Sequence, residues 1–264
     1  MMNNSLPILI CYSRSGGTLM NRILGSLENV IVLSEVNPWG SFKPMLEQAQ
    51  EWFRLINDEE RRDLERRTFK EQIGELQKRA TENGKTIIIR DWSTANFMKG
   101  LVRNRKPSYR LETMIELGRS FSLKPLVLMR DPYSAWKSNS DNFGKYFDLC
   151  PESFFREYRK YLFSIQSMPR IKLEEFTSFP RQHIRWICGY WNLTFSEKCL
   201  TDFYQFVHCT GDNTLARPIE RGAGIQKVGP EPWPENLDQK TINTLKRAYR
   251  MTSYNLAIPI HSPG

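Results

Sequence analysis

The stretch PILICYSRSGGTLMNRIL, residues 7–24, decides the fold. An apolar run typical of a buried strand ends at Ser13, and an amphipathic helical pattern begins at Thr18. When a strand enters a helix through a glycine-containing turn, the N–H groups of the turn and of the helix N-terminus point at one spot. The stretch therefore predicts a strand–turn–helix unit that binds an anion.

The residue types in this turn suit an anionic ligand, because glycines permit close approach, hydroxyls donate hydrogen bonds and arginine adds a bidentate cation. The candidate anion-binding residues are Ser13, Arg14, Ser15, Gly16, Gly17, Thr18 and Leu19. The nearest known phosphate loop, Walker A, requires a lysine and an earlier glycine that this turn lacks. The turn therefore fits a phosphate group better than a triphosphate, and a turn that only tightens the connection is the alternative.

The rest of the chain alternates strand-like and helix-like segments. Apolar runs without alternation indicate parallel strands that are covered on both faces. The expected strands are residues 6–12, 30–33, 86–90, 125–130 and 170–176. The expected helices are 18–27, 58–82 (one helix or a pair), 109–119, 134–143, 153–167, 181–191 and 237–251. This pattern predicts an α/β fold: a single P-loop-like domain over 1–264, with a central parallel sheet of about five strands and helices on both faces.

Composition narrows the partners and cofactors. The net charge of +9 favours anionic partners, but no basic stripe interleaved with aromatics predicts a nucleic-acid surface. The five cysteines are scattered and form no C-x-x-C pair, and no cluster offers three or four metal ligands, so we expect no metal. The N-terminus has neither a basic signal region nor an apolar run of membrane length, which predicts a cytoplasmic protein without a transmembrane segment.

A second stretch, PLVLMRDPYSAWKSNSDN (125–142), places Arg130 at a strand end and Ser138 eight residues later on a helix. Together with SRSGGTL (13–19), it resembles the sulfotransferases that use 3′-phosphoadenosine 5′-phosphosulfate (PAPS). In that family the first loop holds the 5′-phosphosulfate, and an arginine and a serine eight residues apart hold the 3′-phosphate. The segment PRIKLEEFTSFPRQHIRWICGYWNLTFS (169–196) resembles the family's strand–helix segment that follows. The resemblance implies PAPS as co-substrate.

The resemblance also implies a general base. Many cytosolic members use a histidine after the third strand, but TIIIRDWSTANF (86–97) contains none. The loop is closer to R-S-G-T-T-L-M-R of the tyrosylprotein sulfotransferases, whose glutamate base lies 21 residues beyond the loop arginine. The same offset from Arg14 falls on Glu35, which is the expected base, with Asp91 as second choice. Arg14 and Arg90 are expected to stabilise charge, although a surface pair of Arg90 with Asp91 is an equal alternative.

A late Gly/Pro-rich loop, residues 210–235, resembles the family's loop that closes over the nucleotide, with Arg217, Arg221 and Lys227 as phosphate ligands. Trp92 is a candidate to stack on the adenine, and Trp39 is a candidate wall of the acceptor pocket. Residues 37–82 and 103–110 are expected to shape that pocket, whose acceptor is a small molecule, a glycan or a lipid-like compound.

The resemblance therefore implies a sulfotransferase that moves a sulfuryl group from PAPS to a hydroxyl or amine, with Glu35 as base. Two alternatives stay open: a P-loop small-molecule kinase, which the missing lysine disfavours, and a nucleotide-binding protein without catalytic activity.

Overall fold

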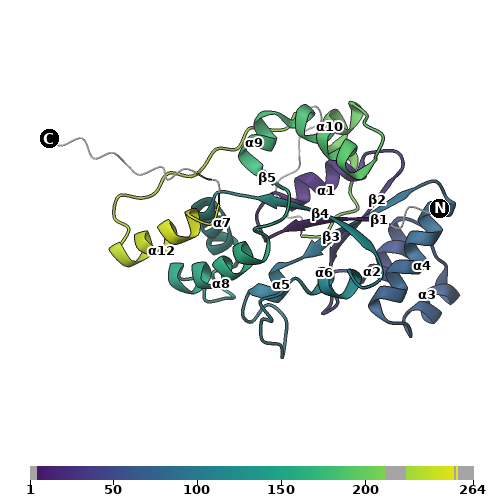
Figure 1. The fold of residues 1–264 in the computed structure, drawn as a ribbon, viewed down its shortest axis with the longest axis horizontal. Helices are drawn as coiled ribbons and strands as arrows, with labels where there is room; N and C mark the ends of the chain where they lie inside the picture. The colour runs from purple at the N-terminus through teal and green to yellow at the C-terminus, as the bar shows by residue number, and fades with distance from the viewer. Residues whose placement is uncertain (1–4, 212–223, 253, 255–264) are drawn as a thin grey trace.

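A computed structural model describes residues 5–211, 224–252 and 254. Five parallel strands form one sheet in the order β2-β3-β1-β4-β5, with helices on both faces (Figure 1). The strands are β1 (Ser5–Cys11), β2 (Val30–Val36), β3 (Thr86–Trp92), β4 (Ser122–Met129) and β5 (Arg170–Lys172). The predicted fold class is therefore confirmed.

The central strand, β1, has both faces covered, which explains its unbroken apolar sequence. Ile8 and Ile10 face the half of the core that includes α4 and α8, whereas Leu9 faces the half that includes α1 and α10. All three side chains are fully buried. Because β1 pairs with β3 on one side and β4 on the other, the residues that follow these three strands meet at one edge of the sheet.

The helices described are α1 (Gly17–Gly25), α2 (Met45–Glu47), the π-helix η1 (Gln48–Trp52), α3 (Asp58–Leu64), α4 (Phe69–Glu82), α5 (Thr94–Phe97), α6 (Glu112–Leu117), α7 (Pro132–Phe143), α8 (Pro151–Ser164), α9 (Leu173–Ser178), α10 (Pro180–Trp191), α11 (Lys198–Thr201), the 3₁₀ helix η2 (Phe203–Gln205) and α12 (Gln239–Tyr249). None of these helices, within the part of the chain that is described, is long and apolar enough to cross a bilayer.

Two sequence predictions are refined by the structure. The segment 58–82 is a helical pair, because capping boxes at Asn57 and Thr68 start two separate helices. The prediction of a strand over 170–176 is wrong beyond Lys172, where α9 begins. Leu173 and Phe176, three residues apart, are both buried on one side of this short helix, a spacing that suits a helix better than a strand.

Truncating a core residue of β3 should destabilise the sheet that carries the site. Ile89 is fully buried and pairs with both Ile8 and Leu33. We expect Ile89→Ala to lower the free energy of unfolding by about 2 to 5 kcal/mol, because the cavity is left among packed neighbours. Urea unfolding measures this, and Val207→Ala, at a side chain that is 67% exposed, should change it by less than about 0.5 kcal/mol. Equal losses from the two variants would contradict this account of the sheet.

Candidate functional site

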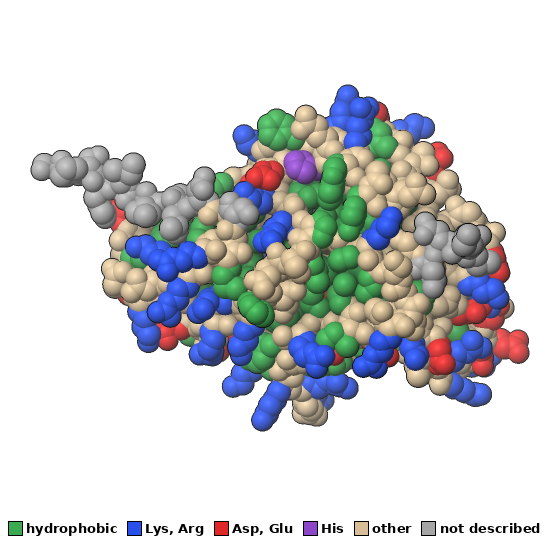
Figure 2. Space-filling model, in the orientation of Figure 1, with side chains coloured by type: hydrophobic (Ala, Val, Ile, Leu, Met, Phe, Trp, Pro, Cys, Tyr) green, Lys and Arg blue, Asp and Glu red, His purple; other side chains and the backbone are tan. Residues whose placement is uncertain are grey.

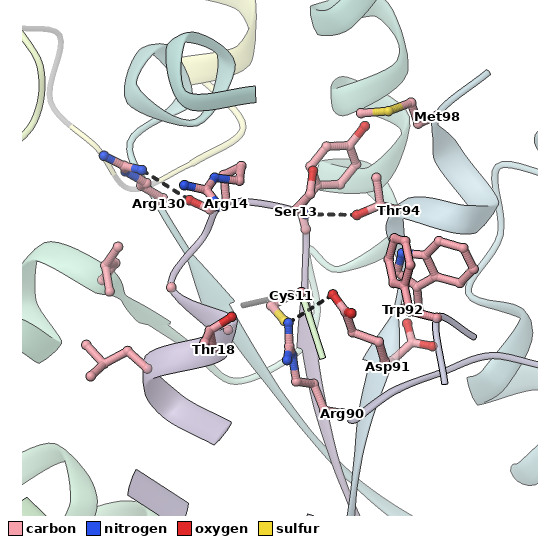
Figure 3. Close-up of a pocket in the computed structure, with 18 of the residues that line it drawn as sticks. Cys11, Ser13, Arg14, Thr18, Arg90, Asp91, Trp92, Thr94, Met98 and Arg130 are labelled. Atoms are coloured by element: carbon pink, nitrogen blue, oxygen red, sulfur yellow. Dashed lines mark hydrogen bonds and ion pairs between the residues drawn. The ribbon is translucent and has the colours of Figure 1, made fainter. Parts of the chain in front are cut away.

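A cavity of about 690 Å³ opens where β1, β3 and β4 end (Figure 3). Its walls include many of the residues singled out in the sequence. The predicted residues that line it are Ser13, Arg14, Gly16, Gly17, Thr18, Leu19, Glu35, Arg90, Asp91 and Arg130. Segments far apart in the chain thus converge here, as expected when parallel strands end at one edge of a sheet.

The glycine turn has the shape that its sequence predicts. Gly16 adopts φ 86° at the N-cap of α1, and no side chain caps this end of the helix. Gly17 lies against the floor of the site, since a Cβ there would be 2.6 Å from Cys11 Sγ and 3.0 Å from Arg90 Nε. Both positions therefore require glycine, and the uncapped N–H groups of α1 are available to a ligand.

Ser13 holds the turn in place. Its N–H donates to Thr94 Oγ1 at 2.8 Å, its carbonyl oxygen accepts from Asn139 Nδ2 at 3.1 Å, and its hydroxyl donates to Asn139 Oδ1. The Ser13 side chain is thus already engaged by α7. Ser15 lies outside the cavity lining, and its buried hydroxyl has no partner among the residues described.

The loop and the end of β4 form one cationic centre. Arg130 Nη1 donates to the carbonyl oxygen of Arg14 at 3.2 Å, and Arg14 Nε donates to Ser138 Oγ at 3.1 Å. Arg130 Nε is buried and has no partner among the residues described. Ser138 does not line the cavity itself, but it is one hydrogen bond away through Arg14. The two groups of residues that the sequence analysis expected to bind anions are therefore adjacent.

Two tyrosines from the C-terminal region stabilise the segment that follows Arg130. The next residue, Asp131, caps α7 by accepting from Ser134 N at 2.9 Å, and it also accepts a hydrogen bond from Tyr249 of α12. The N–H of Asp131 donates to Glu174 Oε1 at 3.0 Å, and Tyr254 donates to the other oxygen of Glu174 at 2.6 Å. Burial and the neighbouring carboxylate raise the pKa of Tyr249, which keeps this phenol a donor.

A buried ion pair forms another part of the cavity wall. Arg90 Nη2 donates to Glu35 Oε1 at 3.0 Å, and Figure 3 draws the contact of Arg90 as a dashed line. Burial acts to lower the pKa of Arg90, but the Glu35 carboxylate, Cys11 and Cys209 together more than offset this effect, and the net pKa is raised. Glu35 has φ 51° at an irregularity in β2, which turns its side chain out of the regular strand pattern. Glu35 Oε2 is buried without a partner among the residues described.

The segment that precedes residue 212 covers this ion pair. Arg90 Nη1 donates to Ser34 Oγ at 3.0 Å and to the carbonyl oxygen of Thr210 at 3.2 Å. A Cβ at Gly211 would lie 2.8 Å from Glu35 Oε1, so only glycine fits there. The sequence analysis missed Ser34 and Thr210, although Thr210 and Gly211 belong to the Gly/Pro-rich segment that it marked.

Asp91 is held differently from Glu35. Its two carboxylate oxygens accept hydrogen bonds from the hydroxyls of Ser93 and Thr113. Burial raises the pKa of Asp91 to about 6, against the lowering effect of those hydroxyls. The hydroxyls of Ser93 and Thr113 thus hold the Asp91 carboxylate in place.

Of the remaining predicted residues, some line the cavity and others do not. Arg217 and Arg221 lie outside the described residues, and Lys227 is exposed and outside the lining, although the neighbouring Val228 lines the cavity. Trp92 lines the cavity, whereas Trp39 does not. The lining residues that the sequence analysis did not name are Cys11, Tyr12, Arg22, Phe42, Thr94, Met98, Leu101, Phe143, Phe147, Leu173, Gly211 and Val228. Within the described residues, no cluster of three or more histidine, cysteine or carboxylate side chains offers a metal site.

Comparison with known proteins shows which fold the chain has. No family model matches the sequence, and no curated protein matches it. Among solved structures, the sulfotransferase domain from the Synechococcus PCC 7002 olefin synthase superposes with a TM-score of 0.66 at 15% identity, covering 96% of this chain and 95% of that one. The sulfotransferase domain from the curacin biosynthetic pathway gives 0.63 at 15% identity, covering 96% and 99%. The chain therefore has the fold of these sulfotransferase domains over nearly its whole length.

The raised pKa of Asp91 predicts a pH-dependent stability. The ordinary pKa is 3.8 and the folded value is about 6, so the folded state binds this proton more tightly than the unfolded chain. The Asp91 contribution to stability should therefore fall as the pH rises from about 4 to about 6. In Asp91→Asn this titration is lost. As the pH rises from about 4 to about 6, the free energy of unfolding of the variant should therefore increase by about 2 to 3 kcal/mol relative to that of the wild type.

Urea unfolding of both proteins at several pH values measures that difference. Exposed carboxylates titrate equally in the two proteins and cancel when they are compared. Parallel stability curves from pH 4 to 7 would show that Asp91 keeps an ordinary pKa in the folded state.

Proposed function

We propose that the protein is a sulfotransferase that uses PAPS as donor and a hydroxyl or amine compound as acceptor. One observation carries the proposal: the cationic centre of Arg14 and Arg130, with Ser138 hydrogen-bonded to Arg14, borders the same cavity as the buried pair of Glu35 and Arg90. A bisphosphorylated nucleotide suits the first group, and proton abstraction suits the second. The fold shared with sulfotransferase domains supports this assignment.

The donor side fits PAPS on chemical grounds. When bound, PAPS supplies the sulfuryl group and a phosphate leaving group. The uncapped N–H groups of α1 and the hydroxyl of Thr18 would hold the phosphosulfate, since both Thr18 and the turn line the cavity. The 3′-phosphate would be held by Ser138 and by Arg130, whose buried Nε has no partner among the described residues.

Glu35 is the better candidate for the base. Arg90 fixes Oε1, which leaves the buried Oε2 to accept a proton from the acceptor. Asp91, the second choice, already accepts hydrogen bonds at both oxygens. Arg90 would then orient Glu35 and stabilise negative charge in the transition state, because a buried guanidinium acts strongly in a site of low dielectric.

The two alternatives fit the site less well. A kinase needs a cation that reaches the β- and γ-phosphates, but the turn offers Arg14, whose Nε is held by Ser138. The ion pair itself serves the packing of the site, but a binding protein without catalysis does not account for the buried Oε2 of Glu35, which has no partner among the described residues.

Nucleotide binding distinguishes a sulfotransferase from a kinase. The desulfated product, 3′,5′-bisphosphoadenosine (PAP), should stabilise the protein by about 2.7 kcal/mol at 100 times its dissociation constant, while ATP with Mg²⁺ should not. Arg130→Gln should weaken PAP binding about tenfold or more, because a charge-assisted contact is lost. Thermal shift and calorimetry measure both effects, with Arg119→Gln, at an exposed site, as the control. Stabilisation by ATP and not by PAP would reject the proposal in favour of a kinase.

Substitution of the base separates catalysis from binding. Glu35→Gln keeps the shape of the side chain but cannot take a proton, so sulfuryl transfer should fall by a factor of about 10² to 10⁴. PAP affinity should stay within about threefold, because the donor is held by other residues. Mass-shift assays with labelled PAPS and a pool of acceptors measure the transfer, and Glu28→Gln, at an exposed carboxylate, is the control. Transfer that persists unchanged in Glu35→Gln would remove Glu35 from the mechanism.

A further inference from the structure

The cavity has two chemically different sides. Figure 3 shows Arg14 and Arg130 on one side, and Trp92, Thr94 and Met98 on the other. Thr94 is the polar side chain among these last three, and its oxygen already accepts from Ser13 N. The side away from the cations therefore offers apolar surface to a ligand and little hydrogen bonding.

The apolar side extends to the mouth of the cavity. Phe42 lines the cavity, is 62% exposed, and packs on Trp92 with ring centroids 4.7 Å apart. Leu101 and Phe147 also line the cavity, and a Cβ at Gly100 would lie 3.7 Å from the Phe147 ring, which places these two segments side by side. An exposed aromatic beside an apolar wall favours an apolar ligand, because its burial removes this surface from water.

The segment that supplies Met98 and Leu101 is strongly basic. Residues 98–110 carry five positive charges and no negative one, more than half of the net +9 of the chain. The cations are Lys99, Arg103, Arg105, Lys106 and Arg110, and all five are exposed. In Figure 2 Lys and Arg side chains gather over this segment, below the band of hydrophobic side chains that crosses the middle of the face.

These cations have no salt-bridge partner among the described residues, in contrast to others on the surface. Lys43 pairs with Glu51 at 2.6 Å, and Arg79 pairs with Glu60 and Glu75. Arg105 instead lies over the Trp39 ring, 5.1 Å from its centroid, which joins the basic segment to the loop that carries Phe42. The excess positive charge therefore lies next to the apolar mouth.

We propose that the acceptor is an amphipathic alcohol: an apolar chain with a hydroxyl at one end and an anionic group at the other. This inference rests on the proposed function. The hydroxyl reaches Glu35, the chain lies along Phe42, Met98 and Leu101, and the anionic group is held by the cations of residues 98–110. A slender molecule is required because Glu35 is only 13% exposed and lies deep in the site. An uncharged glycan has no matching hydrogen-bond partners along this wall.

A pair of probes of equal length tests the proposal on the wild-type protein. Calorimetry of the PAP-saturated protein should show that 10-hydroxydecanoate binds about fivefold or more tightly than 1,10-decanediol at low salt, since the pair differs by one charge. The preference should shrink as NaCl rises to 1 M, because exposed charges are screened. With labelled PAPS, the hydroxy acid should also be the better acceptor.

Two matched double variants test which cations cause the preference for the hydroxy acid. Arg103→Gln/Arg105→Gln should lose most of the preference for the hydroxy acid. Arg62→Gln/Arg66→Gln, which removes the same charge from exposed positions in α3 and just after it, should keep the preference. Affinity for PAP should be equal in both variants, which separates this test from that of the donor site.

The outcomes are distinct. Equal binding of the two probes, or a preference that is insensitive to salt and to Arg103 and Arg105, would overturn the proposed acceptor and leave the sulfotransferase assignment standing. Tight binding of a polyglutamate peptide with no binding of either decane probe would also overturn it, in favour of an acidic protein acceptor. A protein that fails to bind PAP would instead refute the proposed function itself.

Discussion

The site depends on one buried guanidinium. Arg90 is only 5% exposed, and burying an isolated charge costs far more free energy than a folded chain has to spare. The charge is tolerated because Glu35, Ser34 and Thr210 all contact it. Those contacts draw β2, β3 and the segment before residue 212 together, and Gly17 packs directly against the same side chain. The contacts that compensate this one charge therefore fix the relative positions of the glycine turn and the Glu35 carboxylate.

The ion pair between Arg90 and Glu35 matters both for the packing of the site and for its chemistry. A buried ion pair usually adds little net stability, and removing one partner is strongly destabilising. Here the pair also leaves one carboxylate oxygen of Glu35 unpartnered among the described residues, next to a cationic centre built from Arg14 and Arg130. Local strain accompanies it, since Arg14 and Glu35 both have positive φ. Strained non-glycine residues cluster at functional sites, where the surrounding structure holds them in place.

The sequence predicted the sheet well because parallel strands buried on both faces read as unbroken apolar runs. It also singled out the glycine turn, Arg130 and Glu35, which the structure brings to one cavity. It failed where tertiary contacts outweigh local pattern: Leu173 to Phe176 reads as a strand but forms a short helix. The contact of Arg90 with Glu35 spans 55 residues and depends on an irregular turn of β2, so no local pattern indicates it. Most of the apolar cavity wall was not singled out from sequence, since aromatic and aliphatic residues in a cavity wall and in a core have the same sequence signature.

The hydrogen bonds of Tyr249 to Asp131, just after β4, and of Tyr254 to Glu174 of α9 have a consequence for synthesis on the ribosome. They close contacts over 118 and 80 residues, to Asp131 and Glu174, and such distant pairings form late. A nascent chain can therefore complete its sheet while the strand end that carries Arg130 still lacks its support. This support for the segment after Arg130 would then form only when residues 249–254 have emerged from the exit tunnel.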